Sequence, residues 1–279
     1  FSGEISMKNF QTKENAQDFS EREFTVLDDM VSVIMPSFNT ASYIAQAIRT
    51  VQNQTYQNWE LLIVDDCSSD DTDAVVATFL EDRRIRYMKN ERNIGAAMSR
   101  NRALREARGR WIAFLDSDDL WRKNKLKRQI AFMKKNGYHF SYTKYGEIDE
   151  KSKRTGVIVS GPKHITKRKM YDYCWPGCLT VMYDSRVVGR LQVMDIKKNN
   201  DYAMWLKVVE RADCYLLEEC LALYRRGRAG SVSTQRYGEL VKWHYRLFRK
   251  NGSNKVLAGI QVIRNLIFGA LKKIVYKKK

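Results

Sequence analysis

Short apolar runs rich in β-branched and aromatic residues alternate with amphipathic segments over the first half of the chain. The pattern predicts strands at residues 31–35, 60–64, 85–89 and 111–115, and helices at residues 43–52, 71–80, 96–107 and 123–135. Such an alternation is typical of βαβ units, in which helices join parallel strands. The sequence therefore predicts an α/β fold with a mostly parallel sheet flanked by helices.

The regularity fades after about residue 138. We expect strands at residues 139–145, 156–160, 179–183, 214–218 and 222–225, and a helix at residues 201–211. Residues 161–176 are mixed, basic and aromatic, and are expected to form a mobile loop. From residue 238 onward the chain is helical in pattern, basic and apolar.

Basic residues outnumber acidic ones, and the excess is unevenly placed. The formal net charge is +18 over 279 residues. Residues 1–30 contain three basic and seven acidic residues, a net charge of −4, whereas residues 240–279 contain eleven basic residues and no acidic one, a net charge of +11. This asymmetry indicates a tail that meets an anionic surface, either a membrane or a nucleic acid.

Five scattered cysteines, an odd number, imply no disulfide framework and fit a reducing cytosol best. Cys174 and Cys178 lack a second cysteine pair or a nearby histidine to complete a zinc site, so we interpret them as small buried residues. Residues 1–30 lack the apolar stretch of a signal peptide, and the sequence has no uncharged run of the length that a spanning helix requires.

Three carboxylates follow the predicted strand at residues 111–115, in the run Asp116-Ser117-Asp118-Asp119. Ligands of open α/β sheets bind at the carboxyl ends of the strands. Carboxylates there suit a hard divalent cation that shares its remaining positions with substrate phosphates. We therefore interpret this acidic cluster, in a strongly basic chain, as a metal–diphosphate site.

Two more motifs follow predicted strands. The segment 36–39 (Pro-Ser-Phe-Asn) is explained, taken alone, by a turn before a helix. In the segment 64–70, Asp70 can cap the next helix. Asp66 can accept hydrogen bonds from a base or ribose at the sheet edge.

The last two motifs lie at predicted helix starts. Gly95 and the small residues after it let a ligand approach the backbone, where a helix N-terminus favours phosphate, and Arg100 can add a charged hydrogen bond. Asp201 is explained most simply as a helix cap. Beside a cleft it would also be a suitable general base.

The order and spacing of the five motifs resemble those of the inverting family 2 glycosyltransferases over roughly residues 31–230. The matching segments are Pro-Ser-Phe-Asn at 36–39, Val-Asp-Asp-x-Ser-x-Asp at 64–70, Asn-x-Gly-x-x-x-x-Arg-Asn at 93–101, Asp-Ser-Asp-Asp at 116–119, Asn-Asp-Tyr-x-x-Trp at 200–205 and Leu-Tyr-Arg-Arg at 223–226. The resemblance implies the GT-A fold, a Rossmann-like sheet flanked by helices, here with a C-terminal helical basic extension.

This resemblance also implies a division of the chain. Residues 1–29 would form a flexible N-terminal extension and residues 30–237 the GT-A catalytic domain. Within that domain, residues 30–120 would be the nucleotide-binding half and residues 121–237 the acceptor half. Residues 238–279 would form a basic amphipathic helical tail.

Site roles follow from the same resemblance. Asp118 is the implied ligand of a divalent cation, Mn²⁺ or Mg²⁺, with Asp116 as a second candidate, and Asp201 is the implied catalytic base. The implied nucleotide- and donor-binding residues are Pro36, Phe38, Asn39, Asp66, Gly95, Arg100, Asp116 and Ser117.

Three departures from the family pattern matter. Asn200 stands where many members have glutamate, and Arg226 or Arg228 would replace a histidine that reaches the diphosphate. The Gln-x-x-Arg-Trp motif of processive members is absent, which favours single additions. The acceptor-side candidates are Trp175, Asn200 and Trp205.

The expected activity is metal-dependent, inverting transfer of a sugar from a nucleoside-diphosphate donor, expected to be a UDP-sugar. The expected acceptor is a saccharide or a polyprenyl-diphosphate-linked glycan of surface polysaccharide biosynthesis. We expect a cytoplasmic enzyme, peripheral on the inner face of the cell membrane; the oligomeric state stays open.

The sequence allows two alternative functions to be compared with this one. A sugar-nucleotide nucleotidyltransferase would need a glycine-rich basic loop after the first strand, which residues 36–42 lack. A nucleic-acid-binding protein would use the basic tail, but no nucleic-acid-binding motif is present, so we expect no nucleic-acid partner.

A helical stripe runs along the tail, formed by Val256, Ile260, Ile263, Ile267, Ala270 and Ile274. Arg264, Lys272 and Lys273 interrupt the apolar runs. Such a helix suits the plane of an anionic bilayer. It can also pack on the catalytic domain with a solvated cationic edge, and the two arrangements can coexist.

Overall fold

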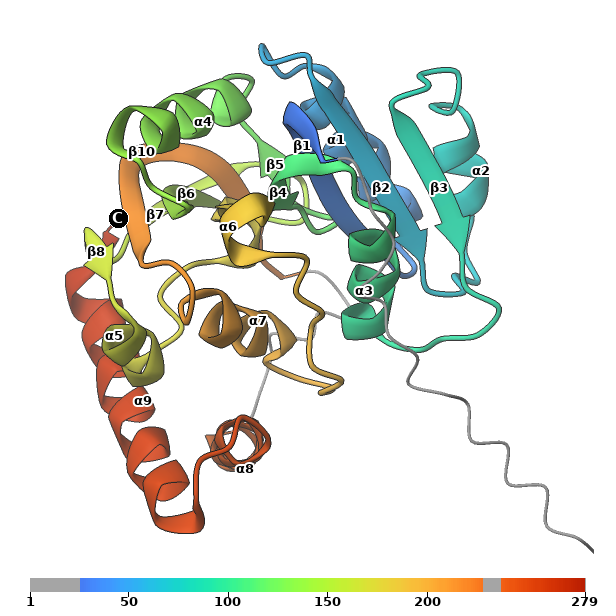
Figure 1. The fold of residues 1–279 in the computed structure, drawn as a ribbon. Coiled ribbons are helices and arrows are strands. Elements are labelled where there is room, and N and C mark those ends of the chain that lie inside the picture. The colour runs from blue at the N-terminus through green and yellow to red at the C-terminus, as the bar shows by residue number, and fades with distance from the viewer. Residues whose placement is uncertain (1–25, 228–236, 279) are drawn as a thin grey trace, which may run out of the picture.

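The computed structural model describes residues 26–227 and 237–278, which fold as one mixed sheet with helices on both faces (Figure 1). Four parallel strands form one half of the sheet, in the order β3-β2-β1-β4. Their bounds are β1 (Leu27–Ser37), β2 (Trp59–Asp65), β3 (Ile85–Lys89) and β4 (Gly109–Phe114). The predicted α/β fold is confirmed, and β1 begins earlier than the predicted residue 31.

Helices follow these strands as the alternation predicts, namely α1 (Ala41–Gln52), α2 (Thr72–Ala77), α3 (Ala96–Glu106) and α4 (Lys125–Asn136). The α1 helix shows why the pattern works. Its buried residues recur at helical spacing, so one apolar stripe packs on the sheet while the polar side faces water: Ile44, Ala47, Ile48 and Val51.

The second half of the sheet is mixed in direction. The strand β9 (Met182–Asp184) runs antiparallel to both β4 and β6 (Phe140–Ile148), whereas β10 (Cys214–Arg225) runs parallel to β6. The remaining elements before the tail are β5 (Leu120–Trp121), β7 (Arg154–Val159), β8 (His164–Ile165), α5 (Lys167–Asp172), the 3₁₀ helix η1 (Cys178–Thr180), α6 (Ser185–Val188) and α7 (Asn200–Val208).

Two predictions in this half were wrong in detail. The strands expected at 214–218 and 222–225 are one strand, β10, whose register shifts absorb the irregular sequence between them. The segment 161–176, expected to be a mobile loop, contains β8 and α5. The α5 helix is capped by Thr166, whose side chain accepts a hydrogen bond from the Lys169 backbone N–H, and it is too short to show a helical period.

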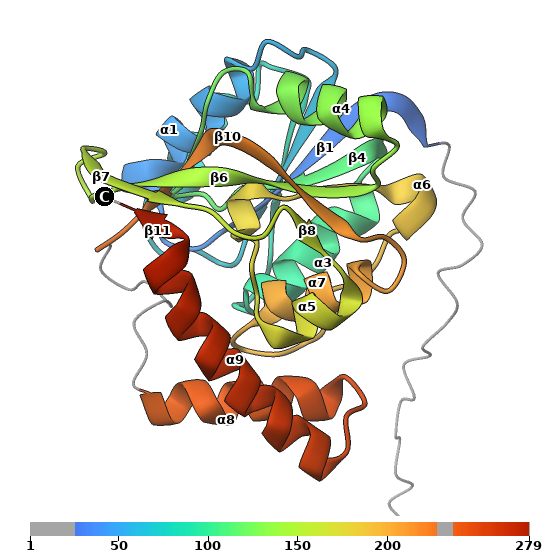
Figure 2. The same cartoon turned by 90° about the vertical axis from the view of Figure 1, so that its left-hand side faces the viewer.

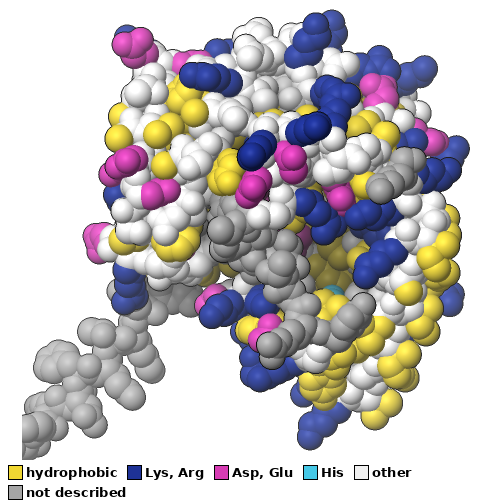
Figure 3. Space-filling view, turned by 180° about the vertical axis from the view of Figure 1, so that it is seen from behind, with side chains coloured by type: hydrophobic (Ala, Val, Ile, Leu, Met, Phe, Trp, Pro, Cys, Tyr) yellow, Lys and Arg dark blue, Asp and Glu magenta, His cyan; other side chains and the backbone are white. Residues whose placement is uncertain are grey.

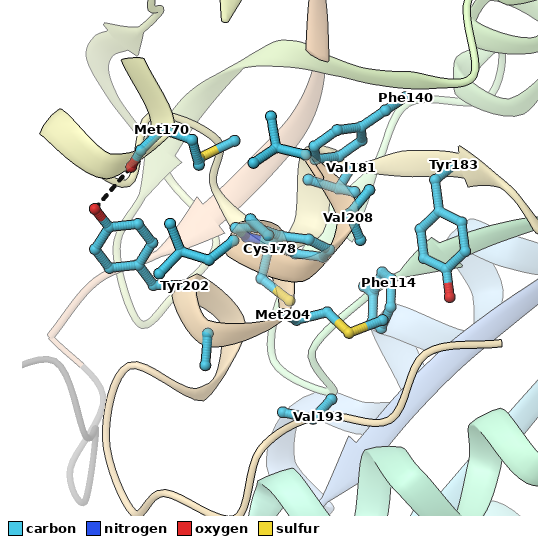
Figure 4. Packing of buried hydrophobic residues seen from close by; sticks show 14 of the residues in the cluster. Phe114, Phe140, Met170, Cys178, Val181, Tyr183, Val193, Tyr202, Met204 and Val208 are labelled. Carbon is cyan, nitrogen blue, oxygen red and sulfur yellow. Dashed lines mark hydrogen bonds between the residues drawn. The ribbon is translucent and has the colours of Figure 1, made fainter. Parts of the chain in front are cut away.

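Apolar side chains form two buried clusters. The larger one joins β4 to α7, and part of it is drawn in Figure 4. There Trp205 lies edge-on to Phe114, with ring centroids 5.2 Å apart, and is fully buried. The hydroxyl of Tyr202 donates to the Met170 carbonyl oxygen at 2.7 Å, which ties α7 to α5. The start of α7 is therefore held rigidly beside the end of β4.

The C-terminal tail forms α8 (Tyr237–Lys250) and α9 (Lys255–Val275), and it returns to the sheet (Figure 2). The short strand β11 (Lys277–Lys278) pairs antiparallel with β7 at the sheet edge. Ala258, Val262 and Asn265 of α9 are buried against the domain. Of the two arrangements considered for the tail, the structure thus contains packing on the domain. Within residues 26–227 and 237–278, no helix combines the length and apolar character needed to cross a bilayer.

Candidate active site

The loops after β1 and β2 are joined by hydrogen bonds at the carboxyl edge of the sheet. The backbone N–H of Asn39 donates to Ser68 Oγ at 2.9 Å, and the Ser69 N–H donates back to Asn39 Oδ1 at 2.9 Å. Asn39 has a left-handed backbone with φ of 50°, a conformation that asparagine tolerates. Asp70 accepts from the Ala41 N–H at the start of α1 as well as from Thr72 at the start of α2, so it caps two helices rather than one.

Phe38 projects from this edge with 43% of its surface exposed, while Pro36 is buried in β1. An exposed aromatic ring beside two ordered loops can stack on a planar ligand.

Asp66 organises the loop that leads into α3. Its carboxylate accepts hydrogen bonds from the backbone N–H groups of Ile94 and Gly95, at 2.9 and 2.8 Å, and from the Asn90 side chain at 2.9 Å. Gly95 has φ of 89°, and a side chain there would meet nothing within 4 Å, so the helix start is open. The structure thus gives Asp66 a positioning contact; the predicted contact with a base stays a prediction.

Arg100 connects two motifs that are far apart in the sequence. Its guanidinium donates to Asp116 Oδ1 at 2.5 Å and to Asn200 Oδ1 at 2.6 Å. Burial alone would lower the pKa of Arg100, but Asp116 and other nearby groups raise it, so the side chain is a fixed cation. A single buried cation therefore holds the end of β4 against the start of α7.

The acidic run after β4 is packed closely. Asp116 and Asp118 are half-buried, whereas Ser117 and Asp119 are buried. Burial, together with the charges of Asp118 and Asp116, raises the pKa of Asp119 well above its ordinary value. Among the residues that the structure describes, Asp119 Oδ2 has no hydrogen-bond partner. The cluster thus concentrates negative potential that a cation would offset.

Arg225 supports this run, and the sequence motifs gave it no role. Its backbone N–H donates to Asp119 Oδ1 at 2.8 Å, and its Nε donates to the Asp118 carbonyl oxygen at 2.8 Å. Its guanidinium also donates to Gln46 of α1 and lies 4.7 Å from the ring centroid of Tyr43. The only sequence signal was its place in the Leu-Tyr-Arg-Arg segment; the partners are brought together by the fold.

Asp201 lies in the first turn of α7, half-buried. Burial raises its pKa, while the charge of Arg100 and the Tyr202 N–H, which donates to Asp201 Oδ1 at 2.8 Å, act in the opposite direction. A carboxylate with a raised pKa is a stronger base than an ordinary aspartate once it is ionised. Asn200 presents its oxygen to Arg100, so its placement is beside the donor-side cluster.

The remaining acceptor-side candidates are placed differently from the expectation. Trp205 is fully buried in the core, so its ring is a packing group. Trp175 is 5% exposed, and its indole N–H donates to the Lys169 carbonyl oxygen at 2.9 Å. Its ring packs edge-on to Phe268 and Tyr276 of the tail, at 6.0 and 5.7 Å. Neither tryptophan offers an open ring face to an acceptor.

The tail contributes to this side of the site. Lys272 of α9 donates to the carbonyl oxygens of Trp175, at 2.7 Å, and Cys174, at 3.5 Å. Burial and, next to it, the charge of Asp201 raise the pKa of Cys174. Asn265 of α9 donates to the Tyr202 hydroxyl at 3.1 Å, directly beside Asp201 in the sequence.

The diphosphate candidate Arg226 directly follows the end of β10. Arg226 is 52% exposed at its side chain and pairs with Glu147 at 2.9 Å. Arg228 lies outside the residues that the structure describes.

A sheet of this topology, with an acidic run at its carboxyl edge, has the GT-A fold. Crystal structures of S. aureus TarS 1–349 share the fold; the complex with UDP-GlcNAc superposes with a TM-score of 0.66 at 19% identity, over 84% of this chain and 70% of that one. A Pyrobaculum calidifontis mannosyltransferase, PcManGT, in complex with GDP-Man and Mn²⁺, superposes with a TM-score of 0.59 at 15% identity, over 86% of this chain and 75% of that one.

Sequence comparison narrows the class. The Glycosyl transferase family 2 model matches residues 32–185. The Escherichia coli enzyme WfgD, a UDP-Glc:alpha-D-GlcNAc-diphosphoundecaprenol beta-1,3-glucosyltransferase, is 40% identical over 220 residues, covering 77% of this chain and 84% of WfgD. TuaG, a Bacillus subtilis glycosyltransferase named for teichuronic acid biosynthesis, is 39% identical over 198 residues, covering 70% of this chain and 79% of TuaG. The chain belongs to glycosyl transferase family 2 and is a glycosyltransferase.

Proposed function

We propose that the protein transfers one sugar per encounter from a UDP-sugar to a polyprenyl-diphosphate-linked saccharide, with inversion at the anomeric carbon. The observation that carries the proposal is the Arg100 bridge. It fixes the acidic run after β4 and the Asn200–Asp201 pair on two sides of one buried guanidinium. An in-line displacement needs the leaving group and the base on opposite faces of the sugar, and the contacts of Arg100 with both motifs support such an arrangement.

Asp201 is the proposed catalytic base. It would take the proton from the acceptor hydroxyl as that oxygen attacks the anomeric carbon. Its burial favours this role because a desolvated carboxylate binds a proton more strongly. The sugar–phosphate bond breaks in the same displacement, and the nucleoside diphosphate leaves with the electron pair.

Phe38, Asn39 and Asp66 are proposed to form the donor end, together with the open start of α3 at Gly95 and with Ser117. The exposed ring of Phe38 can stack on the base. The free backbone N–H groups at a helix N-terminus favour a phosphate. Arg226 is the proposed diphosphate contact in place of the family's histidine, with its pairing to Glu147 keeping it at the sheet edge; Arg228 is a second candidate.

Mn²⁺ or Mg²⁺ is the proposed cofactor, with Asp118 as ligand and Asp116 as a second candidate. The described residues contain no group of three His, Cys, Asp or Glu side chains that could hold an ion unaided. One or two carboxylates completed by substrate phosphates fit such ions, and the crowded acidic run supplies these carboxylates. The bound ion would offset charge developing on the departing diphosphate.

The relatives support the choice of substrates. WfgD is named for a UDP-Glc donor and a diphosphoundecaprenol-linked acceptor. TuaG is named for a cell-surface polymer. We infer that this chain acts in surface polysaccharide assembly, on the inner face of the cell membrane where such an acceptor is held, and that nucleic acid is not a partner.

Calorimetric titration of UDP, GDP and TDP, with and without Mn²⁺, tests the donor site. We expect UDP to bind in a metal-dependent manner, and Asp118→Ala to abolish that dependence. Glu81→Ala, which removes an exposed carboxylate beyond α2, is the matched control and should bind UDP normally. Folded wild-type protein that binds no nucleotide would refute the proposal.

A further inference from the structure

The helix α9 turns its most apolar stripe away from the domain. Its residues that pack inward include the polar side chains Gln261 and Asn265, whereas Ile263, Ile267 and Ile274 are 60%, 54% and 78% exposed. At 3.6 residues per turn, one outer stripe gathers six branched aliphatic residues. These are Val256, Ile260, Ile263, Ile267, Leu271 and Ile274. An ordinary surface helix shows the reverse arrangement.

Contacts on the inner face fix this rotation. Asn265 donates to the Tyr202 hydroxyl, and Lys272 donates to the Trp175 carbonyl oxygen. At Gly269, an added Cβ atom would lie 2.9 Å from the Tyr173 ring, so only glycine permits the close approach. The helix cannot roll to hide its stripe without breaking these contacts. The outer stripe is therefore a permanent surface feature, visible along the right-hand edge in Figure 3.

Cations border the stripe. Lys255 and Lys273 are exposed on one flank, and Arg264 lies on the other. Beside Arg264, a groove of about 630 Å³ opens between α5 and the turn joining α8 to α9. Lys167 and Arg168 line this groove together with Leu257 and Ile260, so basic and apolar groups meet at the edge of the stripe. Its one acidic lining residue, Asp172, is paired with Arg264.

We propose that α9 lies in the plane of an anionic phospholipid bilayer, with the outer stripe inserted among the acyl chains and the bordering cations at the lipid phosphates. Apolar insertion combined with electrostatic attraction is how interfacial helices bind such membranes. Charge argues against a second copy of the chain on this face, because residues 240–279 carry a net charge of +11 and would repel each other. This membrane proposal rests on the proposed function in one respect only: a lipid-linked acceptor would give the enzyme a reason to bind a membrane.

Binding of α9 to a bilayer would also orient the candidate active site relative to the membrane. The inner face of α9 holds the segment around Cys174 and Trp175 and also contacts Tyr202, the residue after Asp201 in the chain. A bilayer on the outer face would therefore lie one helix diameter from the acceptor side, about 10 Å. A lipid-linked acceptor held at the membrane surface would then approach the site from the side of α9.

Vesicle sedimentation with the full chain tests the proposal, using phosphatidylcholine alone and phosphatidylcholine mixed with phosphatidylglycerol. We expect binding to the mixed vesicles that weakens with salt. The double variant Ile263→Asn/Ile267→Asn should bind at least about tenfold more weakly. Lys255→Gln and Lys273→Gln should each weaken binding roughly fivefold. The control is Val187→Asn on α6, which removes a branched residue that is 44% exposed and should bind like wild type.

UDP titration on the same samples separates this proposal from the proposed function. A double variant that binds UDP normally but not vesicles supports the proposal. Wild-type protein that binds UDP and ignores anionic vesicles overturns it and leaves the transferase function intact. Vesicle binding without any nucleotide binding would refute the function alone. If light scattering shows that the wild type is a dimer and the double variant a monomer, the stripe is a self-association surface and the bilayer proposal is wrong.

Discussion

The helices α1 and α9 carry apolar stripes of similar spacing but turn them in opposite directions. In α1 the stripe of Ile44, Ile48 and Val51 is buried on the sheet. In α9 the stripe of Ile263, Ile267 and Ile274 faces outward, while the inner face contacts the domain through polar side chains and a few apolar ones. The pattern of a helix thus reports an apolar face, and the tertiary contacts decide what that face meets.

The two helices also support different sides of the candidate site. The start of α1 receives Asp70 and adjoins the proposed donor loops, whereas α9 contacts Trp175 and Tyr202 on the proposed acceptor side. Stability and activity should therefore respond differently to changes in the two regions.

The largest expected effect is a loss of turnover without a loss of stability, on replacing Asp201. Asp201→Asn should lower kcat by about 10²–10⁴-fold, because the base is lost while its hydrogen bond to the Tyr202 N–H can remain. Since the folded-state pKa of Asp201 is raised, its ionisation opposes folding once the pH rises through that pKa. The variant should be at least as stable as wild type at neutral pH.

Turnover and thermal unfolding measured across pH check this expectation. Wild-type activity should fall on the acid side at a pH above the ordinary aspartate range. If Asp201→Asn keeps a near-normal kcat, Asp201 is not the catalytic base.

The next prediction compares how much the apolar stripes of α1 and α9 contribute to the free energy of unfolding. Ile48→Ala should lower the free energy of unfolding by about 2–5 kcal/mol, because it leaves a cavity between α1 and the sheet. Ile267→Ala, at an exposed position of α9, should change it by less than about 0.5 kcal/mol. Denaturant unfolding of both variants measures the difference. Equal losses would mean that the α9 stripe is covered in solution.

A smaller effect is expected on the inner face of α9. Lys272→Met should cost about 1–3 kcal/mol of unfolding free energy by leaving two carbonyl oxygens without their donor. It should raise the acceptor KM more than the donor KM. Lys135→Met, which replaces an exposed lysine on α4 away from the tail, is the control and should change neither the stability nor the acceptor KM.

The pH dependence of the free energy of unfolding tests whether Lys272 is buried as a cation. Burial lowers the pKa of Lys272 to about 8 from 10.5. Between these values the unfolded chain binds more protons than the folded one, so this group makes stability rise with pH. The wild-type curve minus the Lys272→Met curve should rise in that window. A flat difference would mean that Lys272 is not buried as a cation.

The smallest effect is expected at Asn265. Asn265→Ala should cost about 1 kcal/mol, because the Tyr202 hydroxyl loses one partner but still donates to Met170. Urea titration would detect this loss. A change in acceptor KM without any loss of stability would place Asn265 in direct contact with substrate instead.

The fold was predictable from the sequence where signals are local. Strands ending at Asp65 and Phe114, and the helices after them, follow from alternation over a few residues. The same local reasoning failed for residues 161–176, because a six-residue helix is too short to show its period. Residue type does not reveal burial either, and the acceptor-side candidates Trp175 and Trp205 are both buried.

The sequence by itself determined which groups stand at the strand ends and helix starts, because pattern and capping act within a few residues. It determined the acidic run after β4 and the apolar stripe of α9. Only the tertiary structure decided that Arg100 joins Asp116 to Asn200, that Arg225 supports Asp118 and that the stripe faces outward. Those contacts join residues as many as 107 positions apart, and no local energy term relates such positions until the chain packs.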